Sequence, residues 1–357
     1  MKKRGYSLFL LGLITLSLVG CGKKEVLPPP EPDVPVIAEP TPPPPPPPPY
    51  VPSGTNPLTG LPMEEKFENN RPVAVMLNNL RAAQPQLGTS MADIIYEVPA
   101  EGGITRMLAV YQTLDGVGNL GSIRSARPYY MELALGHDAL YVHAGGSPDA
   151  YADIQAWDMD NMDGVNGGSD AEIFWRDAAR RKTAGYEHSM LTSGENILGY
   201  ADHFRTERRG DYPQMFSAGG ATAGGTAAEH VTLRFSEYKT GKFDYDPAMG
   251  QYLVRQYGEE YIDGNTGEQL GVTNLLVLNT SISVISGDTA GRLAVKLTGD
   301  GKGSYFCEGK SIPIHWSKAD RNSPLVYTTE GGGALTLKQG NSYVCIITPR
   351  TSTLTVE

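Results

Sequence analysis

Two short turns in the first half of the chain hold most of the side chains that could bind or transform a ligand. The first contains Arg124, Ser125 and Arg127, and the second contains His143 and Ser147. Each turn follows an apolar run and precedes a segment that opens with proline, which is typical of a strand leading into a helix. The N–H groups and dipole of a helix start favour anions, and guanidinium groups match phosphate or carboxylate. These residues therefore predict an anion-binding site.

Arg106 follows a Gly-Gly turn and is expected to converge on the same place. Three acidic residues, Glu97, Glu101 and Asp149, occur in the same stretch and offer a different interpretation. They would neutralise the arginines in a purely structural network, because buried or crowded charges are usually paired. Both interpretations remain open from the sequence, and the position of the carboxylates decides between them.

Catalysis at this site would need an acid or base beside the arginines. Glu97 and His143 are the candidates, and the corresponding activity is a hydrolase or transferase acting on phosphorylated cell-envelope glycans. The sequence fixes no partner for either residue, and the G-x-S-x-G pattern of a serine nucleophile is absent around Ser147, which is better interpreted as a helix N-cap. A non-enzymatic binding or scaffolding protein is therefore the leading expectation.

An acidic run at residues 158–164 resembles a calcium-binding loop only superficially. Met162 stands at an acidic position of that loop, and Ser169 stands where a glutamate is needed. The six histidines are dispersed and form no His-x-His or HExxH pair. We interpret the run as a surface turn and expect no metal site and no cofactor.

The N-terminus has the pattern of an export signal. Lys2, Lys3 and Arg4 precede an apolar segment at residues 8–19 that is too short to be a stable membrane span. The segment ends in Leu-Val-Gly before Cys21, a sequence that resembles a bacterial lipobox. We expect a signal peptide at residues 1–20, lipidation of Cys21, and anchoring to the outer face of the cell membrane, because acyl chains give a durable attachment.

Residues 21–53 are rich in proline and include eight consecutive prolines at positions 42–49. Such a segment forms no core and is expected to be an extended, disordered stalk between the lipid and the folded chain. Loss of the signal peptide removes three positive charges, which takes the formal net charge from −10 to −13. So acidic a chain argues against nucleic acid as a partner.

The remaining sequence divides into two regions that differ in pattern. Residues 54–216 combine apolar strand-like runs with helical segments and predict an α/β-type domain with a mixed sheet flanked by helices. Residues 217–229 are a Gly- and Ala-rich linker, and residues 230–357 predict a mostly antiparallel β-domain. The fold class is therefore α+β. Expected strands and helices of the first region lie at 73–77, 94–97, 106–112 and 140–143, and at 128–135, 148–157, 171–181 and 193–204.

Cys307 and Cys345 lie in separate expected strands of the second region. An exported chain permits a disulfide between them. The alternative is two small buried side chains without a bridge. Spacing alone does not separate these possibilities.

A resemblance to a known family rests on several segments in order: NPLTGLP, RPVAVMLNN, ADIIYEVPAEGGITRMLAVYQ, GSIRSARPYY, DALYVHAGGSPDA and FWRDAARR. They resemble the YerB-like family of bacterial lipoproteins, over nearly all of residues 54–350. The sequence departs from the family at 183–190, where TAGYEHSM, containing His188, replaces a shorter segment. The resemblance implies export and N- and C-terminal parts of unknown function. The expected partner is an anionic envelope component or an envelope-synthesis protein.

Overall fold

The computed structural model describes residues 52–219, 222 and 224–357. The expected signal peptide, the lipidation site at Cys21 and the proline-rich stalk up to residue 51 lie outside the described residues. The described residues all belong to one compact unit. Among the described residues, no helix combines the length and the hydropathy that crossing a bilayer requires.

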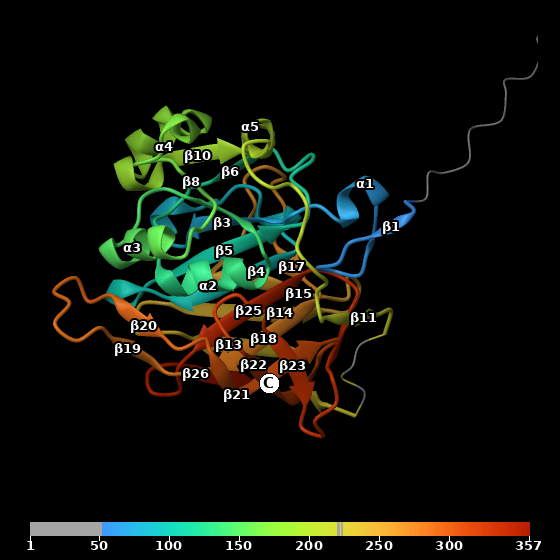
Figure 1. Ribbon diagram of the computed structural model, residues 1–357. Coiled ribbons are helices and arrows are strands. Elements are labelled where there is room, and N and C mark those ends of the chain that lie inside the picture. Colours follow the sequence, from blue (N-terminus) through green and yellow to red (C-terminus); the bar gives the residue numbers. More distant parts are fainter. Residues whose placement is uncertain (1–51, 220–221, 223) are drawn as a thin grey trace, which may run out of the picture. The chain divides into compact units, whose positions relative to one another are not determined.

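One mixed sheet runs through the centre of this unit (Figure 1). Its order is β12 (Thr226–Ala227), β22 (Lys310–Lys318), β21 (Gly299–Cys307), β18 (Asn274–Asn279), β25 (Ser342–Ile347), β4 (Ile94–Pro99), β5 (Thr105–Tyr111), β3 (Val73–Asn78), β7 (Leu140–His143) and β8 (Asn161–Asp163), with β23 (Val326–Thr329) beside β22. The pairs β18–β25, β25–β4, β3–β7 and β7–β8 are parallel, and the others are antiparallel.

The joint between the two regions is the parallel pair β4–β25. Its register runs from Ile94 opposite Ser342 to Glu97 opposite Cys345. Strands of the N-terminal region therefore continue directly into strands of the C-terminal region. Strand β12 lies within the predicted linker, residues 217–229, and pairs with β22 at the edge of the same sheet, after β11 (Met215–Ser217) in the chain.

The central strands are buried on both faces, as their nearly continuous apolar sequences predict. All six residues of β3 are buried. Val75 and Leu77 pack into one hydrophobic core, while Ala74 and Met76 pack into a second core on the opposite face. This alternation follows from the two-residue period of a strand. Two separate apolar layers thus hold the sheet in place.

A second, antiparallel sheet contributes to the first core. It consists of β16 (Glu259–Glu260), β15 (Gln251–Gln256), β14 (Thr240–Asp246), β13 (His230–Arg234) and β26 (Thr353–Val356), with β17 (Gly271–Val272) beside β15. Helix α2 (Pro128–Gly136) contributes four large side chains to the second core, and α3 (Pro148–Ala156) adds Ala150. The observed α+β architecture matches the fold class expected from the sequence.

Smaller elements complete the unit. They are β1 (Gly54–Thr55), β2 (Pro62–Met63), α1 (Glu65–Glu68), β6 (Asn119–Gly121), β9 (Trp175–Arg176), α4 (Ala178–Thr183), β10 (Met190–Ser193), α5 (Gly194–Ala201), β19 (Ile282–Val284), β20 (Leu293–Val295) and β24 (Thr336–Lys338). The expected helix at 171–181 is wrong in its first part. Residues Trp175–Arg176 pair with β10, and α4 begins only after Asp177, whose side chain accepts a hydrogen bond from the Arg180 N–H at 2.7 Å.

Of the two possibilities that the sequence leaves open for Cys307 and Cys345, the disulfide does not form. Cys307 and Cys345 are buried free thiols. They lie in β21 and β25, which are separated by β18, and they belong to cores on opposite faces of the sheet. Two side chains that point to opposite faces across an intervening strand cannot reach bonding geometry. Both cysteines are therefore small buried side chains, the alternative that the sequence left open.

Candidate functional site

The loop between β4 and β5 positions the first carboxylate of the site. Glu101 is followed by Gly102 and Gly103, which adopt positive φ angles of 73° and 75°. Side chains other than glycine rarely adopt this conformation. The Ser236 hydroxyl donates a hydrogen bond to the Gly103 carbonyl oxygen at 2.5 Å and ties the loop to the C-terminal region. The Glu-Gly-Gly sequence thus builds a tight turn that fixes the direction of Glu101.

Arg106 and Arg127 share the Glu101 carboxylate. Arg106 Nη2 donates to Glu101 Oε1 at 2.8 Å, and Arg127 binds both oxygens through Nε and Nη2. Arg106 also donates to the Ser125 carbonyl oxygen at 3.0 Å. Only 4% of the Arg106 side chain and 8% of the Arg127 side chain is exposed. Two nearly buried cations therefore face one carboxylate.

Electrostatics at this cluster follow from that imbalance. Burial lowers the pKa of Arg106, and the neighbouring Arg127 lowers it further, while Glu101 acts in the opposite direction. Burial alone would raise the pKa of Glu101, but the hydrogen bond from Arg127 and the charges of both arginines outweigh burial and lower it. The cluster carries excess positive charge and holds Glu101 ionised.

A third and a fourth arginine complete the site. Arg124 Nη1 lies 3.3 Å from both the carboxylate and the carbonyl oxygen of Glu187, a residue whose side chain is largely exposed. The guanidinium carbon of Arg176 lies 3.8 Å from the centre of the Tyr186 ring, and Arg176 donates to the Tyr186 carbonyl oxygen at 2.7 Å. Sequence reasoning missed Arg176 and Glu187, because the pairing of β9 with β10 and the fold of residues 183–190 bring them to the site.

The two turns singled out from the sequence lie side by side. The Ala126 N–H donates to the Gly145 carbonyl oxygen at 2.8 Å, and the Ala144 N–H donates to the Arg124 carbonyl oxygen at 3.0 Å. Asp163 supports the second turn from β8, because its Oδ1 accepts the Gly145 N–H at 2.7 Å. Tyr151 donates to the other oxygen of Asp163 at 2.8 Å. The acidic run expected to be a surface turn therefore contributes a buried aspartate that orders the site.

These elements enclose a polar cavity of about 440 Å³. Its lining includes all the predicted arginines and Ser125, together with side chains that the sequence did not reveal. The full lining is Glu101, Arg106, Ile123, Arg124, Ser125, Arg127, Ala144, Gly145, Gly146, Tyr151, Val165, Asn166, Arg176, Tyr186, Glu187 and Met190. Four guanidinium groups face two carboxylates there. The buried Nε atoms of Arg106 and Arg124 have no hydrogen-bond partner.

His143 and Ser147 do not line this cavity, which corrects their expected role as ligand-binding residues. His143 is fully buried, with Nδ1 donating to the Gly145 carbonyl oxygen at 2.8 Å and Nε2 3.0 Å from Asn161 Oδ1. Ser147 accepts a hydrogen bond from the Ala150 N–H at 3.2 Å and caps α3. The cap is the structural role that its position before proline predicts. Both residues shape the turn and leave the ligand contacts to others.

Glu97 is also absent from the cavity, which corrects its candidacy as an acid or base there. Its side chain lies in the core, 3.4 Å from Lys239 Nζ. It accepts hydrogen bonds from Thr105 and Tyr343 at 2.6 Å each and from Asn79 at 2.8 Å. The pair Glu97–Lys239 joins β4 to the turn between β13 and β14. Glu97 therefore neutralises a lysine of the C-terminal region, and the arginines rely on Glu101.

His188 lies beside the cavity in the segment where the family resemblance departs. Its Nδ1 is 2.8 Å from Asn78 Nδ2, which has only hydrogens to offer, so this ring nitrogen is the acceptor. Burial lowers the pKa of His188, and the charge of Arg124 lowers it further. A neutral ring in this position helps to hold β3 against the 186–188 turn.

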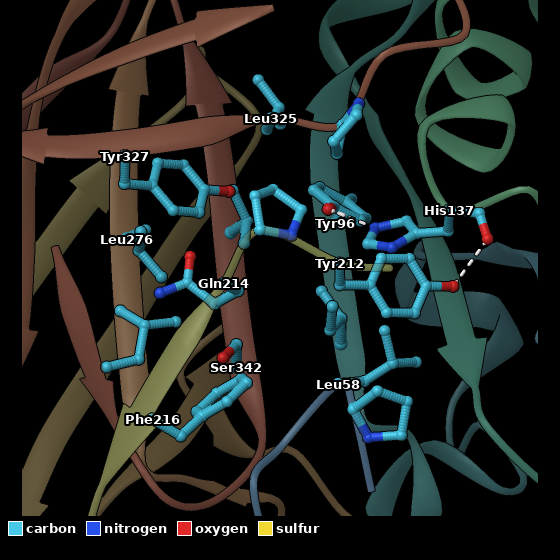
Figure 2. Close-up of a pocket in the computed structure, with 16 residues that line it drawn as sticks. Leu58, Tyr96, His137, Tyr212, Gln214, Phe216, Leu276, Leu325, Tyr327 and Ser342 are labelled. Carbon is cyan, nitrogen blue, oxygen red and sulfur yellow. Dashed lines mark hydrogen bonds between the residues drawn. The ribbon is translucent and has the colours of Figure 1, made fainter. Parts of the chain in front are cut away.

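A second, apolar cavity lies between β4, β18, β23 and the segment around Tyr212 (Figure 2). Its volume is about 40 Å³, which leaves room for only on the order of two or three water molecules. His137 borders it, accepting from or donating to the Tyr96 hydroxyl at 2.7 Å, and the Tyr212 hydroxyl donates to the His137 carbonyl oxygen at 2.6 Å. This cavity is too small for a substrate.

No group of three or more metal-binding side chains occurs within the described part of the chain. The arginine-rich lining of the polar cavity also repels cations. The arrangement is suited to an anion, because preformed guanidinium groups need no reorganisation to receive one.

Comparison with known proteins identifies relatives. The N-terminal domain model of the "Protein of unknown function (DUF3048)" family matches residues 58–207, and its C-terminal domain model matches residues 231–344. A Bacillus subtilis (strain 168) protein named "Putative lipoprotein YerB" is 32% identical over 283 residues, covering 77% of this chain and 81% of that protein. The crystal structure of the YerB protein from Bacillus subtilis superposes with a TM-score of 0.73 at 28% identity, covering 84% of this chain and 99% of that one.

Proposed function

The chain belongs to the YerB-like family with DUF3048 domains, and on that premise we propose that it is an exported, lipid-anchored protein that binds an anionic component of the cell envelope. The name of the Bacillus subtilis relative supports the lipid anchor, as does the sequence Leu-Val-Gly before Cys21 in this chain. Anchoring through Cys21 places the folded unit outside the membrane, where envelope components are accessible.

The excess of arginine in the polar cavity is the observation that carries the proposal. Four guanidinium groups oppose two carboxylates, so a bound dianion would bring the site to neutrality. Arg106 and Arg124 each keep a buried Nε hydrogen without an acceptor. A phosphoryl group has both the charge and the number of acceptor oxygens that this cavity requires.

Binding is favoured over catalysis because both carboxylates that line the cavity, Glu101 and Glu187, are paired with arginines. Glu97 and His143 do not line it, which removes the acid and base of an enzyme acting on phosphorylated glycans. Glu101 lines it, but the arginines lower its pKa and occupy its oxygens. A carboxylate held in this way orients arginines and is a poor general acid.

Arg124 is the residue best suited to a test. Arg106 and Arg127 are nearly buried and bind Glu101 as well as backbone carbonyls, so their loss would disturb the fold. The Arg124 guanidinium binds the side chain and the carbonyl oxygen of Glu187, at 3.3 Å each, and the Glu187 side chain is largely exposed. We expect Arg124→Gln to weaken binding of methyl phosphate by about tenfold or more, the value of one charge-assisted hydrogen bond. Isothermal titration calorimetry of the purified chain measures the affinity.

Arg255→Gln is the matched control. Arg255 also pairs with a glutamate, Glu260, but lies on β15 in the antiparallel sheet, outside the cavity lining. We expect this variant to bind methyl phosphate like the parent. Absence of phosphate binding in the parent, or an equal loss in both variants, contradicts the proposal. In-cell crosslinking from residue 166 then identifies the natural ligand, and capture of a protein alone would contradict a small anion.

A further inference from the structure

An apolar groove of about 440 Å³ borders the same loop that carries Glu101. It is lined mainly by apolar side chains from the loop, from the end of β13 and from the β19–β20 hairpin. The apolar members are Pro99, Ala100, Ile104, Phe235, Ile282, Val284 and Leu293, and the remainder are Gly102, Gly103, Ser236, Ser283, Gly291, Thr348, Arg350 and Thr351. The β19–β20 hairpin, orange in Figure 1, contributes Ile282, Val284 and Leu293 to one wall of the groove. Val284 of this wall is 60% exposed.

The groove and the arginine-lined cavity are separated only by the turn Glu101–Gly103. Glu101 extends its side chain into the arginine cavity, while Gly102 and Gly103 border the groove. A side chain built at Gly102 would meet no atom within 4 Å, so the surface of the turn is open. The main chain at Gly102 therefore leaves space on the side of the turn where a ligand would cross from the cavity to the groove.

The cavity favours an anionic group of a ligand, and the groove favours a hydrocarbon group. The cavity offers excess positive charge, and the groove offers an exposed apolar wall with Arg350 as its one charged residue. Exposed apolar walls beside a polar site commonly mark a ligand groove. Water is removed from the groove at a gain in free energy only if hydrocarbon replaces it.

We propose that the ligand is a lipid phosphate whose phosphoryl head lies among Arg106, Arg124 and Arg127 and whose hydrocarbon chain crosses Gly102 into the groove beside Val284. This assignment rests on the proposed anion-binding function and names its ligand class. A lipid-anchored protein meets such amphiphiles at the membrane surface. The head supplies the anion that the arginines lack, and the chain covers the apolar wall that the hairpin leaves open.

A series of short n-alkyl monophosphates, used below their micelle concentrations, tests the assignment by calorimetry on the purified chain. Methyl phosphate reports the head alone. We expect the affinity to rise by about fourfold for each added methylene until the groove is filled. Arg124→Gln should weaken every member of the series by the same factor, because it acts only on the head.

Val284→Asp should leave methyl phosphate binding unchanged and abolish the dependence on chain length. The exposed position of Val284 makes the variant compatible with folding. Met249→Asp is the matched control: Met249 is similarly exposed, at 57%, but lies at the opposite end of the β13–β15 region. It should retain the full chain-length dependence.

The outcomes separate this inference from the proposed function. If methyl phosphate binds and longer chains bind no better, the lipid is excluded and the anion site stands. If alkyl alcohols bind as tightly as alkyl phosphates, the groove is independent of the arginines and the inference fails. If neither methyl phosphate nor its longer homologues bind, both proposals fail.

Discussion

The buried pair Glu97–Lys239 offers the sharpest test of how the two regions are joined. Both side chains are fully inaccessible, and their charged atoms lie 3.4 Å apart. Lys239 also donates to Gln256 and lies 4.4 Å from the centre of the Tyr257 ring. Burial lowers the pKa of Lys239, and the charge of Glu97 opposes that shift. Each charge thus depends on its partner from the other region.

The expected magnitudes follow from this mutual dependence. Removing one member of a buried pair strands the other charge and typically costs about 3–5 kcal/mol. We therefore expect Lys239→Met and Glu97→Gln each to lower the free energy of unfolding by this amount. The double variant strands no charge, so its loss should be smaller than the sum of the two by about 2–3 kcal/mol.

Urea unfolding followed by tryptophan fluorescence and circular dichroism measures all four proteins of the cycle. Trp157 and Trp175 report on the N-terminal region, and Trp316 reports on the C-terminal region. Because β4 and β25 share a sheet, we expect one coincident transition for both probes. A coupling energy within about 0.5 kcal/mol of zero refutes the reasoning about the pair. Two separate transitions refute the claim that the regions form one cooperative unit.

Two further predictions concern protonation and thiols. Burial, with a smaller contribution from Lys318, lowers the pKa of His137 to about 4, so the unfolded chain binds more protons between this value and its ordinary pKa of 6.5. The contribution of neutral His137 to the free energy of unfolding is then fully present above pH 6.5 and falls by up to about 3 kcal/mol as the pH drops towards 4. Urea midpoints measured across this pH range should fall less steeply in His137→Gln than in the parent. An equally steep fall in both proteins contradicts the prediction. Cys307 and Cys345 should react with a thiol reagent only after denaturation, without prior reduction; a requirement for reductant would contradict their free state.

Local patterns in the sequence predicted most of the elements that frame the site. The apolar runs at β3, β4, β5 and β7 and the proline-initiated helices α2 and α3 occur where the sequence predicts them, with boundaries that agree to within two residues. Each of these signals lies within a window of about ten residues. The pairing of β4 with β25 was beyond such reasoning, because it joins residues such as Ile94 and Ser342 that are remote in sequence.

Local sequence patterns also do not show which remote residues contact a side chain, and this explains the errors about the site residues. The sequence predicts His143 and Glu97 as site residues because polar residues at strand ends often face a ligand. Their partners, Asn161 and Lys239, come from segments that sequence periodicity could not place beside them. Arg176 was missed for the complementary reason: it belongs to a two-residue strand inside a segment that has the pattern of a helix.

The sequence leaves open whether the arginines bind a ligand or pair with glutamates. In the structure some of the arginines pair with a glutamate, but their positive charge is not fully neutralised. Glu101 does pair with Arg106 and Arg127, as the structural interpretation requires. One carboxylate cannot neutralise two nearly buried guanidinium groups, and the expected second one, Glu97, is held by Lys239. Glu101 therefore fixes the directions of the two arginines and leaves a positive charge uncompensated. A site oriented before its ligand arrives loses less conformational entropy on binding, which makes the partial pairing an argument for anion recognition.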